Sequence, residues 1–125
     1  MTYIGTQLKT DETPSVKLLL SARRTMLSNR GGTVDYITAN GLADAVDRLP
    51  AAVEIETCER WLRECAEPRK TINARAYSYY LKHVVENWAN LYISNGAFIQ
   101  AAVNLGYRYA RTGLNASFNM RLKRS

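Results

Sequence analysis

Side chains suited to acid–base, nucleophilic or metal chemistry are few, and their spacing is poor. The only histidine, His83, falls inside a predicted helix, near the edge of its apolar stripe. The cysteines, Cys58 and Cys65, are seven positions apart in another predicted helix, so roughly 10 Å separates them along the axis and excludes a disulfide between them. We predict two buried, small hydrophobic side chains, because burial raises a thiol's pKa and weakens it as a nucleophile. A Cys–His couple brought together by the fold is the catalytic arrangement that these residues leave open.

The carboxylates and glycines do not form a recognisable site either. Asp44 and Asp47 share a turn of a predicted helix, but the third ligand that a metal ion would need is not evident. Gly31-Gly32 precedes a strand-like segment, whereas a phosphate-binding loop follows a strand. We therefore predict a protein that acts by binding and not by catalysis, with no cofactor and no metal.

Charge is distributed unevenly along the chain. The 125 residues include 17 Lys and Arg against 11 Asp and Glu, for a net charge of +6. Residues 1–68 hold 8 of these cations and 10 of the acids, whereas residues 69–125 hold 9 cations and a single acid, Glu86. A basic half of this kind is typical of proteins that bind polyanions or acidic protein surfaces. A solvated basic surface without a partner is the simpler alternative.

Aromatic side chains alternate with cations in the segment Tyr107-Arg108-Tyr109-Ala110-Arg111. Tyrosines beside arginines suit stacking on exposed bases. They suit a protein interface equally well, because both residue types are enriched in interface hot spots. Packing of Tyr107 and Tyr109 over the core is the third interpretation, and the sequence leaves all three open. The same ambiguity applies to Tyr77, Tyr79, Tyr80 and Tyr92.

A short predicted helix, Ala97 to Leu105, ends at Gly106 and is followed by a basic hairpin. In this order of elements, residues 94–123 resemble the recognition helix and wing of winged helix-turn-helix domains. The resemblance implies that Gln100 and Asn104 contact base edges, since an amide can bond adenine bidentately. Because that helix carries no Arg or Lys, phosphate contacts fall to cations of the hairpin and the C-terminal end. These are Arg108, Arg111, Arg121, Lys123 and Arg124, with Tyr107 or Tyr109 stacking on a base.

Helical patterns account for most of the chain. The signals are N-terminal caps, apolar residues at i, i+3, i+4 and i+7, and glycine or proline at the ends. Asn40 is the predicted cap of the second helix and Asn73 that of the longest, with Pro68 to Lys70 as a loop between elements. The predicted helices run from Thr13 to Gly31, from Asn40 to Pro50, from Ala52 to Ala66, from Ala74 to Leu91 and from Ala97 to Leu105.

Strand patterns are confined to two places. Apolar and polar residues alternate strictly from Leu114 to Lys123, which predicts a strand. Residues 107–111 precede it across Thr112-Gly113, so the two segments are predicted to form a β-hairpin. Residues 33–38 are a short strand or an extended link. Either this segment or the N-terminal residues could add a third strand to the hairpin.

These patterns predict one α+β domain over residues 1–125, mainly helical, with about five helices and a C-terminal β-hairpin packed on them. A mildly acidic helical part, residues 1–68, precedes the basic part, residues 69–125. No apolar run approaches the roughly 20 residues that span a bilayer. The first residues lack the pattern of a signal peptide. We therefore expect a cytoplasmic protein without a membrane partner.

The predicted function is non-catalytic binding of DNA or RNA by a small accessory protein of the kind found in phages and plasmids. The alternative is a stoichiometric inhibitor that binds a protein, such as an anti-CRISPR or another anti-defence protein acting on a nucleic-acid-handling complex. An enzyme would require Cys58 or Cys65 beside His83 in a cleft. Tyrosine-rich helix faces also leave a homodimer open.

Overall fold

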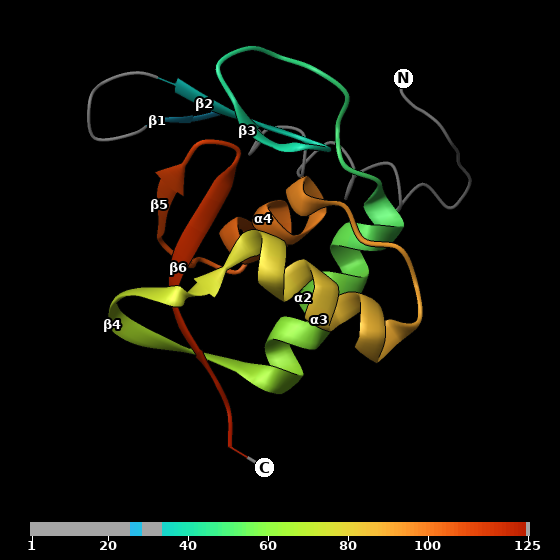
Figure 1. Ribbon diagram of the computed structural model, residues 1–125, viewed down its shortest axis with the longest axis vertical. Helices are drawn as coiled ribbons and strands as arrows, with labels where there is room; N and C mark the ends of the chain where they lie inside the picture. The colour runs from blue at the N-terminus through green and yellow to red at the C-terminus, as the bar shows by residue number, and fades with distance from the viewer. Residues whose placement is uncertain (1–25, 29–33, 125) are drawn as a thin grey trace.

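The computed structural model describes residues 26–28 and 34–124 (Figure 1). These residues form three helices and six strands, and the strands make two three-stranded sheets. The α+β class is confirmed, but the expected mainly helical domain of about five helices is wrong, because strands occupy about as much of the described chain as helices do. The described helices are α2 (Ala52–Cys65), α3 (Ser78–Ala89) and α4 (Asn95–Asn104). None of them is long and apolar enough to cross a membrane.

The N-terminal sheet is antiparallel, and its strand order is β1-β2-β3. Residues 33–38 were predicted as a short strand or an extended link, and residues 34–38 form strand β2. The possibility that this segment adds a strand to the hairpin is wrong, because β2 belongs to a separate sheet. The helix predicted from Thr13 to Gly31 lies mostly outside the described residues, but its part at residues 26–28 is a strand instead. The three strands are β1 (Met26–Ser28), β2 (Val34–Thr38) and β3 (Gly41–Ala43).

The helix predicted from Asn40 to Pro50 is wrong. Gly41 has φ +132°, which a helix does not accept, and it opens β3 after a two-residue turn. The Thr38 hydroxyl donates to the Gly41 carbonyl at 2.9 Å and closes that turn. Val46 is 74% exposed, so the helical spacing of its apolar neighbours did not mark a buried stripe.

The C-terminal sheet has the order β4-β6-β5, and all its pairings are antiparallel. The predicted hairpin is confirmed, with Thr112 opposite Asn115, so Gly113 and Leu114 form the turn. The third strand is β4, which replaces the predicted loop at Pro68 to Lys70 and the start of the predicted long helix. The strands are β4 (Ala66–Tyr77), β5 (Tyr109–Thr112) and β6 (Asn115–Leu122).

Strand β4 is interrupted by an outward loop. Pro68 is opposite Met120 and Asn73 is opposite Phe118, so residues 69–72 face a single residue of β6. We call residues 69–72 the β4 arch, and Figure 1 shows it projecting from the edge of the molecule. Asn73 does not cap a helix, because its side-chain amide donates to the Met120 carbonyl at 3.0 Å and pins β4 to β6 beyond the arch.

Helix α4 lies at the centre of the molecule, between the two sheets and the other helices (Figure 1). Every residue from Asn95 to Ala102 is buried. Phe98 packs against Trp61 of α2 and Phe118 of β6, with ring centroids 6.1 and 5.9 Å away. The helices predicted at residues 52–66 and 97–105 are thus confirmed, whereas the predicted long helix, residues 74–91, is shortened to α3. The helical spacing of residues 74–91 predicts a buried stripe that includes Trp88 and Leu91, but these side chains are 42% and 40% exposed.

Two glycines allow the backbone of the N-terminal sheet to contact the backbone of α4 and of the hairpin turn. A Cβ atom on Gly96 would lie 1.6 Å from the Thr38 carbonyl oxygen, and one on Gly41 would lie 2.1 Å from that of Leu114. Backbone hydrogen bonds use this proximity: Gly96 donates to Ala39 at 3.1 Å and Leu42 donates to Leu114 at 2.8 Å. The sheet therefore docks on the start of α4 and on the turn of the hairpin.

Candidate nucleic-acid interface

The predicted base-reading residues belong to the interior. Gln100 has no exposed surface, and its side-chain amide donates to the Asn104 oxygen at 2.9 Å. Asn104, which is half-buried, donates in turn to Glu59 of α2 at 2.8 Å. These contacts tie α4 to α2. The base contact expected of Gln100 is therefore corrected, because a helix enclosed on all sides cannot enter a nucleic-acid groove with that side chain.

Arg111 and Tyr109 hold the two sheets together. The Arg111 guanidinium lies 2.6 Å from the Asp35 carboxylate and 2.9 Å from that of Asp44. The Tyr109 hydroxyl donates to the other Asp35 oxygen at 2.8 Å. We call Asp35, Asp44, Tyr109 and Arg111 the inter-sheet clamp. Asp35 is fully buried, so the clamp places a carboxylate of β2 directly under the hairpin.

The clamp occupies two of the residues that the sequence assigned to ligand binding, Arg111 and Tyr109. The hydrogen bond to Asp35 raises the pKa of Arg111, and two carboxylates neutralise its charge. Burial, together with the hydrogen bond to Asp35, raises the pKa of Tyr109. Its ring packs against the core. The phosphate contact expected of Arg111 and the stacking expected of Tyr109 are therefore corrected to a structural role.

The other predicted hairpin residues differ in how freely they face solvent. Tyr107 packs against the core, and burial raises its pKa. Arg121 is exposed and pairs with Glu67 at 2.7 Å. The Lys123 ammonium donates to the Arg63 carbonyl at 3.1 Å, whereas Arg124 is exposed. Tyr107 is thus poorly placed to stack on a base.

Arg108 is the predicted residue that the fold places in a basic surface. Its guanidinium donates to the Lys70 carbonyl of the β4 arch, 38 positions away in sequence. The Asn119 side chain fastens the two segments: it accepts from the Arg108 amide at 2.6 Å and donates to the Arg69 carbonyl at 3.1 Å. Arg69, Lys70 and Arg108 are all exposed. We call these three residues the arch cluster.

The cations of the arch cluster have no carboxylate partners within the described part of the chain. Arg69 instead donates to the carbonyl and hydroxyl oxygens of Thr71, at 3.1 and 2.9 Å. Both of its bonds lie inside the arch and help fix its shape. Three exposed cations thus lie on two adjoining segments, and no carboxylate of the described residues pairs with them.

Sequence reasoning selected Arg108, but it set Arg69 and Lys70 aside as a phosphate contact because no glycine-rich loop follows a strand beside them. The adjacent pair at the point where the chain becomes basic was a usable signal. What the sequence lacked was the pairing of β4 with β6, which carries residues 69 and 70 to residue 108. Without that register, the pair is indistinguishable from an ordinary basic loop.

The groups considered for catalysis differ in their exposure to solvent. Cys58 is fully buried, and burial raises the pKa of its thiol. Cys65 is half-buried, and both cysteines are free. His83 is exposed, and its Nδ1 lies 2.8 Å from a Glu86 oxygen. Among residues 26–28 and 34–124, no three His, Cys, Asp or Glu side chains gather as a metal ion would require.

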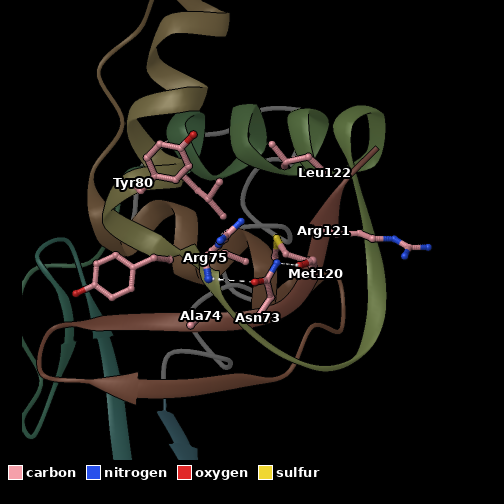
Figure 2. A pocket seen from close by; sticks show the side chains of 10 residues that line it. Asn73, Ala74, Arg75, Tyr80, Met120, Arg121 and Leu122 are labelled. Carbon is pink, nitrogen blue, oxygen red and sulfur yellow. Dashed lines mark hydrogen bonds between the residues drawn. The ribbon is translucent and has the colours of Figure 1, made fainter. Parts of the chain in front are cut away.

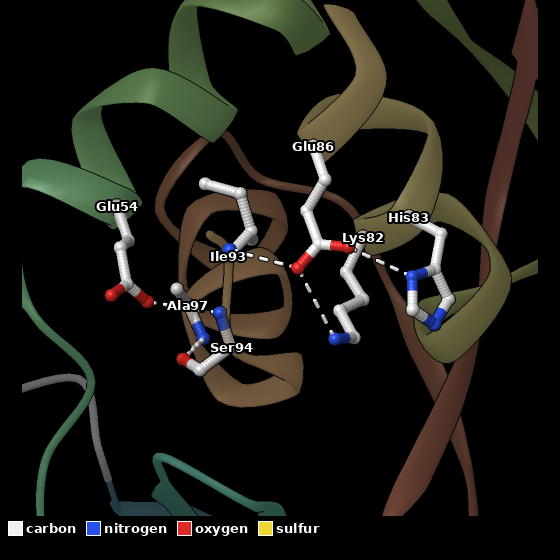
Figure 3. Close-up of polar contacts among 7 residues, drawn as sticks. All are labelled: Glu54, Lys82, His83, Glu86, Ile93, Ser94 and Ala97. Atoms are coloured by element: carbon white, nitrogen blue, oxygen red, sulfur yellow. Dashed lines mark hydrogen bonds and ion pairs between the residues drawn. The ribbon is translucent and has the colours of Figure 1, made fainter. Parts of the chain in front are cut away.

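Glu86 organises the turn from α3 into α4 (Figure 3). Its carboxylate accepts from the Ile93 amide at 3.1 Å and pairs with Lys82 at 3.4 Å. Burial disfavours its ionisation, but the bonds from Ile93 and His83 and the charge of Lys82 outweigh burial and lower the pKa of Glu86. The one acid of the basic half is thus committed to local structure.

Comparison with known proteins does not extend this description. The chain matches no protein-family model, no curated protein and no solved structure. The arch cluster is consequently the feature from which a function has to be argued.

Proposed function

We propose that the protein binds nucleic acid without catalysis, and that the arch cluster is its main contact with phosphates. The observation that carries this proposal is that Arg69, Lys70 and Arg108 lie on adjoining segments fastened by Asn119, and that no carboxylate of the described residues pairs with them. Guanidinium and ammonium groups of this kind suit phosphate oxygens, through charge-assisted hydrogen bonds and release of counterions.

The surroundings of the cluster favour a polyanion over a single anion. Residues 69–125 hold 9 cations and one acid, and that acid, Glu86, already pairs with Lys82. The positive potential therefore extends beyond the three clustered side chains. With Gln100 buried, contacts to the backbone dominate, so we expect weak dependence on base sequence. A cytoplasmic site of action, where thiols such as Cys58 stay reduced, belongs to the same proposal.

A direct test is fluorescence anisotropy with labelled duplex and single-stranded DNA and RNA of mixed sequence, at about 50 and 200 mM salt. We expect micromolar or tighter binding that weakens steeply as salt rises. Replacing Arg69, Lys70 and Arg108 together by Gln should weaken binding at least tenfold and lower the salt slope by about two to three, the value for three lost phosphate contacts.

A matched control removes the same charge elsewhere. Arg48, Arg60 and Arg63 are exposed and outside the cluster, so their joint replacement by Gln should leave most of the affinity intact. Equal losses in both triple variants would mean that net charge and not the cluster determines binding. Absence of binding to every probe at low salt would refute the proposal.

A second candidate function is stoichiometric binding of a protein, the role of an inhibitor. The observation that favours it is a set of exposed aromatic and aliphatic side chains on α3 and the segment after it. Tyr and Trp are the residues most enriched in interface hot spots. A protein captured specifically by the wild type, and lost on replacing Tyr92 and Trp88 by Ala, would support this candidate. The exposed set is Tyr79, Tyr80, Trp88, Leu91 and Tyr92.

A further inference from the structure

A groove of about 650 Å³ lies between β4, the start of α3 and the end of β6 (Figure 2). Its floor is apolar and buried, formed by Ala76, Leu81 and Met120. Tyr80 and Leu122 stand at its rim and are 57% and 46% exposed. Its volume falls within the range of about 300–1,000 Å³ that is usual for small-molecule sites.

The groove exists because β4 leaves β6 a second time. Asn73 is opposite Phe118 and Tyr77 is opposite Ser117, so residues 74–76 have no partner on β6. The Asn73 side chain separates this bulge from the arch: it donates to the Met120 carbonyl at 3.0 Å and accepts from the Arg75 amide at 3.1 Å. The groove and the arch cluster are therefore neighbouring parts of one strand.

Arg75 is the cation that belongs to the groove. It is exposed and lines the groove, and no carboxylate of the described residues pairs with it. Arg121 also contributes to the lining, but Figure 2 shows its side chain extending away, and its guanidinium pairs with Glu67. Two tyrosines line the groove, but Tyr77 is half-buried and its hydroxyl accepts from the Asn115 side-chain amide at 2.8 Å, so Tyr80 is the freely exposed ring. An apolar slot with one exposed aromatic ring, and one cation that no carboxylate of the described residues pairs, suits a flat ring that carries a nearby negative charge.

We propose that this groove takes an unpaired base of a single-stranded nucleic acid, with Tyr80 stacking on the base and Arg75 contacting its phosphate. The inference rests on the proposed function, since the adjacent arch cluster would hold the neighbouring phosphates. A base inside a duplex is stacked and paired and cannot enter. The protein should therefore prefer single strands, and the stacking residue is Tyr80, not Tyr107 or Tyr109.

The test compares three probes of equal length: a mixed-sequence single strand, its duplex, and an abasic strand that keeps the phosphates. Tyr80→Ala should lower single-strand affinity about tenfold, within the 1–3 kcal/mol that stacking on an aromatic side chain contributes per base. It should leave duplex and abasic binding unchanged. Tyr80→Phe should keep the wild-type affinity. Arg75→Gln should lower the single-strand salt slope by about 0.7, the value for one phosphate contact.

Tyr79→Ala is the matched control. Tyr79 is 53% exposed, adjacent in sequence and outside the groove lining, so its loss should leave single-strand affinity intact. Equal effects of the two alanine variants, or equal wild-type affinity for single strand and duplex, would overturn the inference while leaving the arch cluster's function in place. Failure of all three probes to bind at low salt would instead remove the proposed function itself.

Discussion

Arg108 immediately precedes β5 and Arg111 lies within it, three positions further along, yet the fold gives them opposite roles. Arg111 faces the N-terminal sheet and is held by Asp35 and Asp44. Arg108 faces the β4 arch and meets a backbone carbonyl of Lys70. The difference lies in what each cation meets across the chain, because carboxylates neutralise one and no carboxylate of the described chain neutralises the other.

The two regions therefore separate stability from binding. The inter-sheet clamp surrounds a fully buried carboxylate, Asp35, and removing one partner of a buried ion pair is costly. The arch cluster is exposed, and side chains of this kind contribute little to folding. Substitutions in the clamp should change the free energy of unfolding and those in the arch cluster the affinity for a polyanion. The predictions below test the stability side of that contrast.

The largest expected loss of stability is at Gly96, where the N-terminal sheet, which carries Asp35 of the clamp, docks on α4. Ala at this position would place its Cβ 1.6 Å from the Thr38 carbonyl oxygen, and a backbone atom cannot move aside without undocking β2. We expect Gly96→Ala to lower the free energy of unfolding by more than about 3 kcal/mol in urea denaturation.

Gly113→Ala provides the control for that experiment. Gly113 has φ +61° with nothing within 4 Å of an added Cβ, so only backbone strain of roughly 1 kcal/mol is expected. If Gly96→Ala cost no more than Gly113→Ala, close docking of the N-terminal sheet would be ruled out.

The next effect compares the two arginines directly. Arg111→Ala removes the cation that β5 supplies to Asp35 and should lower the free energy of unfolding by about 2–3 kcal/mol. Arg108→Ala, in the same strand region, should change it by no more than about 0.5 kcal/mol. Urea denaturation of both variants tests the contrast. Similar stability losses would show that the clamp and the arch cluster do not differ as described.

The parts of the fold that follow from local patterns could be predicted from the sequence. Helix α2 matches its apolar spacing, α4 ends just before the predicted Gly106, and β6 matches its strict alternation. Residues 40–50 could not be predicted, because Leu42 and Val46 fit a helical stripe although strand pairing and the conformation of Gly41 decide the structure. Strand β4 shows no alternation because its arch and bulge interrupt the pleat, so only pairing with β6 reveals it.

Sequence patterns identified one residue of the arch cluster but not the contacts that complete it. Arg108 was identified from the basic hairpin, but its partners in the arch required the register of β4 against β6. Gln100 was misassigned for a related reason: α4 is buried on all sides, so its polar residues do not mark a solvent face. Arg111 was misassigned because its acids, Asp35 and Asp44, are 76 and 67 positions away.

Within the inter-sheet clamp, the smaller loss of stability should come from Tyr109, its neutral member. Tyr109→Phe removes a hydroxyl that donates to the Asp35 carboxylate at 2.8 Å, and we expect a loss of about 1–1.5 kcal/mol in the free energy of unfolding near neutral pH.

Burial and this hydrogen bond raise the pKa of Tyr109 above its ordinary value of 10.0. The unfolded chain therefore loses the phenolic proton first as pH rises, which favours unfolding of the wild type above about pH 10. The advantage of wild type over Tyr109→Phe should be constant below that pH and shrink above it, as measured by urea denaturation at pH 7, 9 and 10.5. A difference that stayed constant across this range would mean that folding does not raise the pKa of Tyr109, which would contradict donation of its proton to the buried Asp35 carboxylate.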